Sequence, residues 1–353
     1  MPITGFVRLL FFSLMVSVLG ACSNLQVKPN AVGRPGQVLV VAEEETWEGV
    51  VGEAFRDYFD QAYPILPQPE PIFDLTYIAP EDMAKVHKGY RVIMILGNIS
   101  KNNSTARLIR QSLGEEKTAE AMEDFNFNLA YREDLWASGQ LVTYLFAPND
   151  AQLIENIQTR YPIIEKRWLG LDREIAHANA YMGGTNRPAK NRLERILDLK
   201  LELPTDYREA IIDSVDQTVW YRRESNKSSS NILIRVRPYD EQTPVTQASL
   251  IATRDSIGKN YITSAVEGAY MIIDNENMPL IFDETTVAEN YALEARGIWV
   301  MENDFMGGAF LSYMIYDATK QRVVFIDGFL YAPDEDKRHM MQRFEAIFET
   351  LQL

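Results

Sequence analysis

Cysteine is almost absent from this chain of 353 residues, which has only Cys22. A single cysteine excludes an internal disulfide and a metal site built from several thiolates. Histidine is also scarce, with only His87, His177 and His339, which lie far apart. Nor does the sequence contain an H-E-x-x-H helix, an EF-hand loop, a P-loop, a G-x-S-x-G elbow or a G-x-G-x-x-G loop. These absences argue against zinc hydrolases, calcium sensors, α/β-hydrolases and nucleotide-dependent enzymes, and we expect no metal and no cofactor.

Positive charge is in short supply as well. The chain has 35 Lys and Arg against 50 Asp and Glu, which gives a net charge of −15 at pH 7. Such a negative field disfavours nucleic acids and anionic lipid headgroups as partners. An excess of acidic residues is also the ordinary solvated surface of an acidic protein, so the charge does not by itself predict a binding face.

The N-terminus carries the most specific signal. Arg8 and an apolar run, Leu9 to Leu19, precede the small pair Gly20-Ala21 and then Cys22. Residues 1–21 read as a secretory signal. The segment resembles a bacterial lipobox, which implies that Cys22 is acylated and that the bilayer is a partner. A short transmembrane helix or a cleaved soluble signal are the alternatives, but a span needs about 20 apolar residues.

The residues after Cys22 bear on localisation. Ser23 follows, and no acidic cluster lies within residues 23–30. By resemblance to lipoprotein sorting signals, this predicts an outer-membrane protein that faces the periplasm. Residues 22–36 are polar, with Pro and Gly, and read as a flexible tether.

The rest of the chain predicts a mixed α+β protein with two domains. Residues 37–182 contain three continuous apolar runs, which are typical of strands buried on both faces of an α/β sheet with flanking helices. Thr46 is expected to cap the first helix, and Pro162 to start another. The Gly- and Pro-containing stretch from 182 to 190 marks a boundary. Residues 190–353 predict an α+β domain with an antiparallel sheet.

Two groups of residues are candidates for ligand binding. Glu43, Glu44 and Trp47 follow the first buried strand, where open α/β sheets bind ligands. Acidic residues also favour helix N-termini, and Trp47 is equally explained by core packing. Trp299, Glu302 and Asp304 lie beside a Gly-Gly pair, which is compatible with either a mobile binding loop or a hairpin turn with aromatic core residues.

Several segments resemble a known family. They include KPNAVGRPGQVLVVAEEETWEGVVGEAF, RGIWVMENDFMGGAFLSYMIYD and FLYAPDEDKRHMMQRFEAIFETL. They are similar to the DUF4837 family of uncharacterised bacterial envelope lipoproteins, over nearly all of the mature chain, and this resemblance implies no established activity. The segments WYRRE, ILIRVRP and FEAIFETLQL in the second half also resemble a Mog1/PsbP-type αβα sandwich, a fold that usually serves protein binding.

These observations predict a non-catalytic binding or accessory module, anchored to the envelope through acylated Cys22, with an envelope protein as partner. The alternative is a hydrolase that acts on an envelope glycan with carboxylates drawn from Glu43, Glu44, Glu302 and Asp304. Glycosidases need two carboxyl groups about 5–9.5 Å apart. This alternative therefore requires that two of these acids share a cleft.

Overall fold

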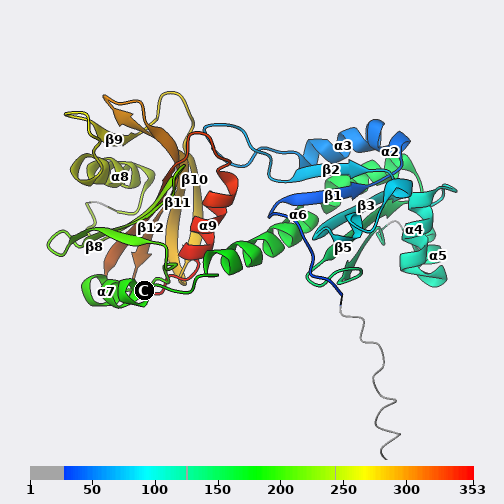
Figure 1. Ribbon diagram of the computed structural model, residues 1–353, viewed down its shortest axis with the longest axis horizontal. Coiled ribbons are helices and arrows are strands. Elements are labelled where there is room, and N and C mark those ends of the chain that lie inside the picture. Colours follow the sequence, from blue (N-terminus) through cyan, green and yellow to red (C-terminus); the bar gives the residue numbers. More distant parts are fainter. Residues whose placement is uncertain (1–27, 125, 243) are drawn as a thin grey trace, which may run out of the picture.

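The protein has two halves, each built around its own sheet (Figure 1). The structure is a computed structural model that describes residues 28–124, 126–242 and 244–353. We call residues 28–180 the N-terminal half and residues 187–353 the C-terminal half. The predicted mixed α/β class, with one sheet in each part, is confirmed. The signal and Cys22 lie outside the described residues, and no helix in the described ranges is long and apolar enough to cross a membrane.

The N-terminal sheet has five strands in the order β2-β1-β3-β5-β4, all parallel except β4. Its fully apolar strands are buried because helices cover both faces. α3 and α6 pack on one face, and α4 and α5 on the other. The bounds are β1 (Gln37–Val41), α2 (Glu44–Glu48), α3 (Val50–Phe59), β2 (Asp74–Ile78), the 3-10 turns η1 (Pro80–Asp82) and η2 (His87–Gly89), β3 (Val92–Asn98), α4 (Ser104–Leu113), α5 (Glu115–Glu123), β4 (Leu129–Glu133), β5 (Leu141–Ala147) and α6 (Asp150–Ala180).

Two local predictions for this half were wrong. Thr46 lies inside the short helix α2, and Gly49 precedes α3. Pro162 does not start a helix but lies inside α6, which runs through 31 residues. A proline inside a helix costs about 3 kcal/mol. The helix continues because buried side chains on both sides of the proline, among them Ile157 and Trp168, pack on the same core.

The C-terminal half is an αβα sandwich with an antiparallel sheet, as predicted. Its sheet order is β10-β11-β12-β13-β8-β7-β6, and β9 also pairs with β11. α8 covers one face, and α7 and α9 cover the other. The bounds are α7 (Arg187–Leu197), β6 (Arg208–Asp213), β7 (Thr218–Glu224), β8 (Ser229–Pro238), α8 (Gln247–Tyr261), β9 (Tyr270–Ile273), β10 (Ile281–Val287), β11 (Asn290–Glu302), β12 (Gly307–Asp317), β13 (Arg322–Tyr331) and α9 (Arg338–Phe348).

The two halves are joined by more than the chain connection. The second part of α6 lies beside α9 (Figure 1). Glu70, from the N-terminal half, accepts hydrogen bonds from the backbone N–H groups of Lys337 (2.6 Å) and Arg338 (2.9 Å) at the start of α9. The guanidinium of Arg338 in turn binds Asp74 at 2.6 Å. A carboxylate at a helix N-terminus satisfies otherwise unpaired N–H groups, so the N-terminal half supplies the cap of α9.

Asp172 on α6 is a buried carboxylate close to this junction. It is 3% exposed, and its Oδ2 accepts a hydrogen bond from the backbone N–H of Gly36 at 2.7 Å. Burial raises the pKa of Asp172 to about 6, although the Gly36 N–H, Arg338 and Arg91 favour the ionised form. Loss of hydration therefore outweighs the favourable contacts of this carboxylate.

Candidate functional site

Glu43 lies where the sequence placed it, after β1, but its carboxylate is engaged. Its Oε1 accepts hydrogen bonds from the backbone N–H (2.9 Å) and the hydroxyl (3.2 Å) of Thr105 at the start of α4. Open α/β sheets often bind ligands at the carboxyl ends of their strands, at the point where the strand order reverses. Here a side chain of the protein satisfies the helix N-terminus at that position.

Trp47 and Glu44 have different surroundings. Trp47 is 8% exposed and stacks on Tyr77, with ring centroids 5.2 Å apart and planes at 3°. The guanidinium of Arg56 lies 4.8 Å from the centre of the same ring. Glu44 is exposed on α2. The contacts of Trp47 are those of a core residue.

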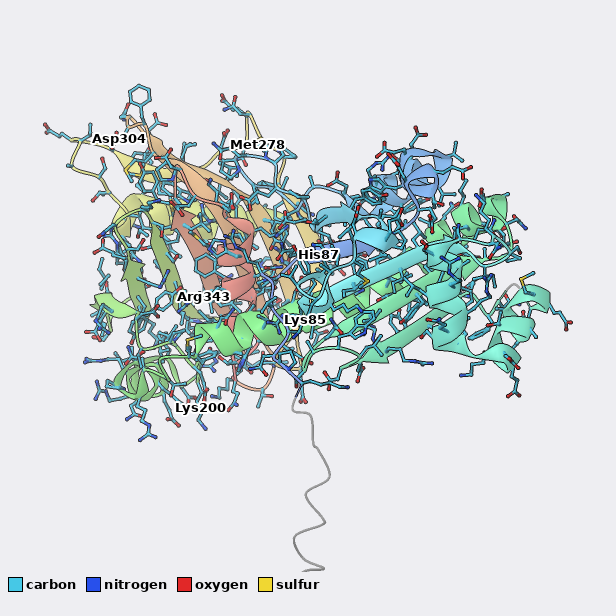
Figure 2. All side chains as sticks on the ribbon, turned by 45° about the vertical axis from the view of Figure 1, so that its right-hand side comes forward. Lys85, His87, Lys200, Met278, Asp304 and Arg343 are labelled. Carbon is cyan, nitrogen blue, oxygen red and sulfur yellow. The ribbon has the colours of Figure 1, made fainter. Side chains whose placement is uncertain are left out.

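The second predicted group lies at the other end of the molecule. Trp299 is buried in β11 and donates a hydrogen bond from Nε1 to the carbonyl of Leu330 at 3.1 Å. Glu302 and Asp304 lie at the tight turn between β11 and β12. Figure 2 shows Asp304 at the end of the C-terminal half that faces away from the N-terminal half. The structure therefore does not bring Glu43 or Glu44 together with Glu302 or Asp304, so no pair that combines the two groups shares a cleft.

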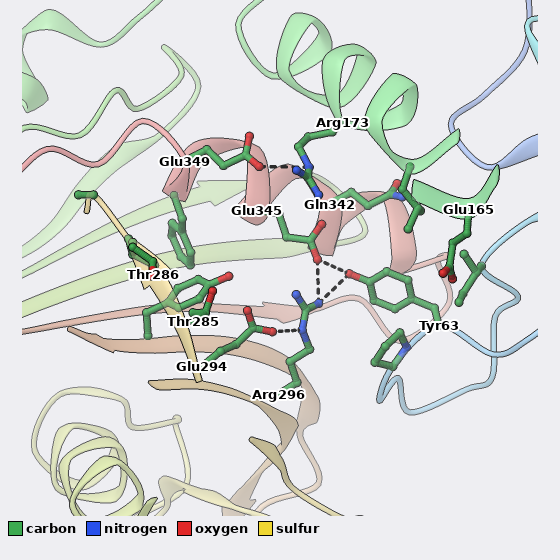
Figure 3. Close-up of a pocket in the computed structure, with 17 residues that line it drawn as sticks. Tyr63, Glu165, Arg173, Thr285, Thr286, Glu294, Arg296, Gln342, Glu345 and Glu349 are labelled. Carbon is green, nitrogen blue, oxygen red and sulfur yellow. Dashed lines mark hydrogen bonds and ion pairs between the residues drawn. The ribbon is translucent and has the colours of Figure 1, made fainter. Parts of the chain in front are cut away.

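A cleft at the junction of the two halves combines side chains that the sequence did not point to (Figure 3). Its volume is about 640 Å³, within the usual range for ligand pockets, which often form at domain interfaces. Its walls are the loop from 63 to 72, α6, the strands β10 and β11, and α9. We call this cavity the junction cleft.

Arg296 is the central charge of the junction cleft. Its Nε binds Glu294 at 2.5 Å, and its Nη1 binds Glu345 at 2.8 Å and donates to the hydroxyl of Tyr63 at 2.9 Å. Tyr63 donates its own proton to Glu345 at 2.7 Å. Figure 3 shows these four side chains converging from the loop, β11 and α9. The cluster therefore links the N-terminal half to the sheet and to α9 of the C-terminal half.

The electrostatics of this cluster are those of a satisfied network. Burial alone would lower the pKa of Arg296, but Tyr63 and the carboxylates of Glu345 and Glu294 raise it. Burial, followed by the nearby Glu345 carboxylate, raises the pKa of Tyr63 well above 10. Arg296 thus stays a cation and Tyr63 stays neutral.

A second ion pair lies at the rim. Arg173 on α6 binds Glu349, which directly follows α9, at 3.1 Å, and both side chains are about half exposed. An exposed pair of this kind contributes about 0–1 kcal/mol, so it can exchange its partner for a ligand group at little cost. The charges around Arg296 in the junction cleft are thus paired with one another, whereas the exposed ion pair of Arg173 and Glu349 can be replaced by a contact with a ligand.

The sequence could not have pointed to this arrangement. Tyr63 stands in a proline-rich loop, and it is separated by 233 residues from Arg296 and by 282 from Glu345. No local spacing connects residues so far apart. The described residues also contain no group of three or more His, Cys, Asp or Glu side chains that could hold a metal ion.

Comparison with known proteins adds two family matches. The model of DUF8532, a domain of unknown function, matches residues 31–180, and that of DUF4837, also a domain of unknown function, matches residues 186–350. The DUF4837 resemblance is thus confirmed for the C-terminal half, whereas the N-terminal half matches a separate model. No curated protein sequence matches the chain.

Solved structures show low similarity to part of the chain. LpqN, involved in cell envelope biogenesis of Mycobacterium tuberculosis, aligns with 12% identity and a TM-score of 0.27 over 44% of this chain and 82% of its own. The Ran-binding protein Mog1p of Saccharomyces cerevisiae aligns with 8% identity and a TM-score of 0.28 over 44% of this chain and 89% of its own. Identities this low transfer no function. Two family models thus match the chain in succession, that of DUF8532 over residues 31–180 and that of DUF4837 over residues 186–350.

Proposed function

We propose that the protein is a lipid-anchored accessory module of the bacterial cell envelope that binds a partner without transforming it, and that the junction cleft is its binding site. The observation that carries this proposal is the Arg296 cluster in a cleft bounded by both halves. The lipobox-like segment that ends at Cys22 supports the proposed lipid anchoring in the cell envelope.

The pairing within the cleft favours binding over catalysis. A general acid or base needs a pKa close to the working pH and access to the substrate. Glu294 and Glu345 are instead fixed beside Arg296, and Tyr63 is a buried donor with a raised pKa. These groups position one another, and they present a shaped surface of fixed charge.

Mass spectrometry of the mature N-terminal peptide tests the proposed lipid anchoring. We expect the wild-type protein to begin at Cys22 and to carry at least two acyl chains, because one chain gives only marginal membrane binding. Replacement of Cys22 by Ser removes the acceptor thiol and should abolish this species. An unmodified Cys22, or a mature start at another residue, would refute lipid anchoring.

Site-specific photo-crosslinking in intact cells tests the binding site. A photoreactive residue at Thr286, in the wall of the cleft, should crosslink one defined envelope component. The matched control places it at Met182, which is 82% exposed and lies between α6 and α7. The proposal fails if Thr286 yields no adduct or the same adducts as Met182.

A further inference from the structure

The outer edge of β10 is open. β10 is the last strand in the sheet order, and its seven residues pair on one side with β11. Among the described residues, no backbone hydrogen bond joins 281–287 to any segment other than β11. Such an edge presents unpaired N–H and C=O groups that can accept another strand.

The junction cleft reaches this edge. Thr285, Thr286 and Val287 all line it, although they are successive residues of one strand. Successive side chains of a strand point to opposite faces of the sheet. Three in a row can border the same cavity only where it also extends around the edge of the strand. An extended chain laid along β10 would therefore lie partly inside the junction cleft.

The charges at this edge select the occupant. Asp283 and Glu284 are exposed on β10. The junction cleft itself is lined by four glutamates and two arginines, Glu165, Glu294, Glu345, Glu349, Arg173 and Arg296. Like charges directly opposite one another in a strand pair are destabilising, and opposite charges are stabilising. A second copy of this strand would meet its own carboxylates, whereas a strand with Lys or Arg would meet complementary charge.

We propose that β10 is the pairing edge for an extended, basic segment of a partner protein, which adds as a strand and directs alternate side chains into the junction cleft. Main-chain hydrogen bonds provide the affinity in this mode of recognition, and pockets for alternate side chains provide the specificity. The inference rests on the proposed function, and it names the class of partner that the site takes.

Synthetic peptides bound to the full-length mature protein in detergent test this inference. The probe is a fluorescent nine-residue peptide of alternating Lys and Val, with two matched peptides: one has Glu in place of Lys, and the other keeps Lys but carries N-methyl groups at alternate positions. We expect the parent to bind, the Glu peptide not to bind, and the N-methylated peptide to bind at least about tenfold more weakly, since it lacks donors for the ladder.

Charge reversal on the protein provides the second measurement. The double variant Asp283→Lys, Glu284→Lys should bind the parent peptide about tenfold or more weakly than the wild-type protein does. The control, Glu116→Lys with Glu120→Lys on the exposed face of α5, makes the same change in net charge and should leave binding intact. Circular dichroism of both variants checks that the fold is retained.

Three outcomes overturn the inference. Equal binding of the parent and N-methylated peptides would mean attraction of charge without strand pairing. Failure of the parent to bind, or its displacement by spermidine at equal concentration, would exclude a peptide strand as the occupant. Crosslinked dimers through β10 would assign the edge to a second copy. A crosslink from Thr286 in cells, with any of these results, would keep the proposed function and reject only the strand mechanism.

Discussion

Replacement of Asp172 by Asn should stabilise the protein at neutral pH. The carboxylate is buried on α6, and burial raises its pKa from an ordinary value of 3.8 to about 6. A difference of about two pKa units corresponds to about 3 kcal/mol. That energy is the cost of ionising Asp172 in the folded state rather than in the unfolded state.

The sign of the pH dependence follows from linkage. Between about pH 4 and pH 6 the folded protein binds more protons at Asp172 than the unfolded chain does, so stability falls as the pH rises through this window. Below it, Asp172 is protonated in both states and resembles Asn. We therefore expect Asp172→Asn to gain about 3 kcal/mol above pH 6 and almost nothing below pH 4.

Urea unfolding at pH 4 and pH 7.5 measures the effect as a difference between variant and wild type, which cancels the titration of all other groups. The amide can still accept the Gly36 N–H that Asp172 accepts at 2.7 Å. The exposed Asp57→Asn on α3 serves as the control and should be neutral at both pH values. If Asp172→Asn is less stable than wild type at pH 7.5, attraction to Arg338 and Arg91 outweighs desolvation and the reasoning fails.

Three further predictions concern stability, two in the C-terminal half and one on α6. Arg254 and Asp327 have no exposed side-chain surface and bind each other at 3.3 Å, so Arg254→Met alone should cost about 3–5 kcal/mol by leaving a buried charge. Addition of Asp327→Leu should restore most of the lost stability, as measured by urea unfolding. If it restores none, the loss in Arg254→Met comes from packing and not from the buried charge. A Cβ at Gly308 would lie 1.9 Å from the carbonyl oxygen of Leu330, so Gly308→Ala should lower stability by about 1–3 kcal/mol. A Cβ at Gly170 in α6 would meet nothing within 4 Å, so Gly170→Ala should raise the stability of the protein by about 0.5–1 kcal/mol. Similar thermal midpoints for Gly308→Ala and Gly170→Ala would contradict this reasoning.

The sheets could be predicted because burial on both faces leaves a direct trace in the sequence. β3 and β5 are mostly apolar and are buried at every residue, since helices cover them on both sides. α6 was misjudged at Pro162 because the contribution of core packing is not visible in local propensity.

The junction could not be predicted, since its energetics depend on pairs that only the tertiary fold creates. Glu70 caps a helix that begins 268 residues later. The acidic residues after β1 were notable in the sequence, yet Glu43 uses its carboxylate at the start of α4. A carboxylate that binds a ligand and one that caps a neighbouring helix have the same sequence signature.

The uninterrupted α6 bears on the proposed binding of a partner in the junction cleft. Its 31 residues extend about 46 Å at 1.5 Å per residue, from the core of the N-terminal half to the wall of the junction cleft. Proteins that close around a ligand do so by bending at loops or at the ends of elements. Here one helix, packed on the core of the N-terminal half, also forms a wall of the junction cleft. A cleft preorganised in this way would avoid the free-energy cost of closure, and selectivity for the proposed partner would depend on the shape that the partner already has.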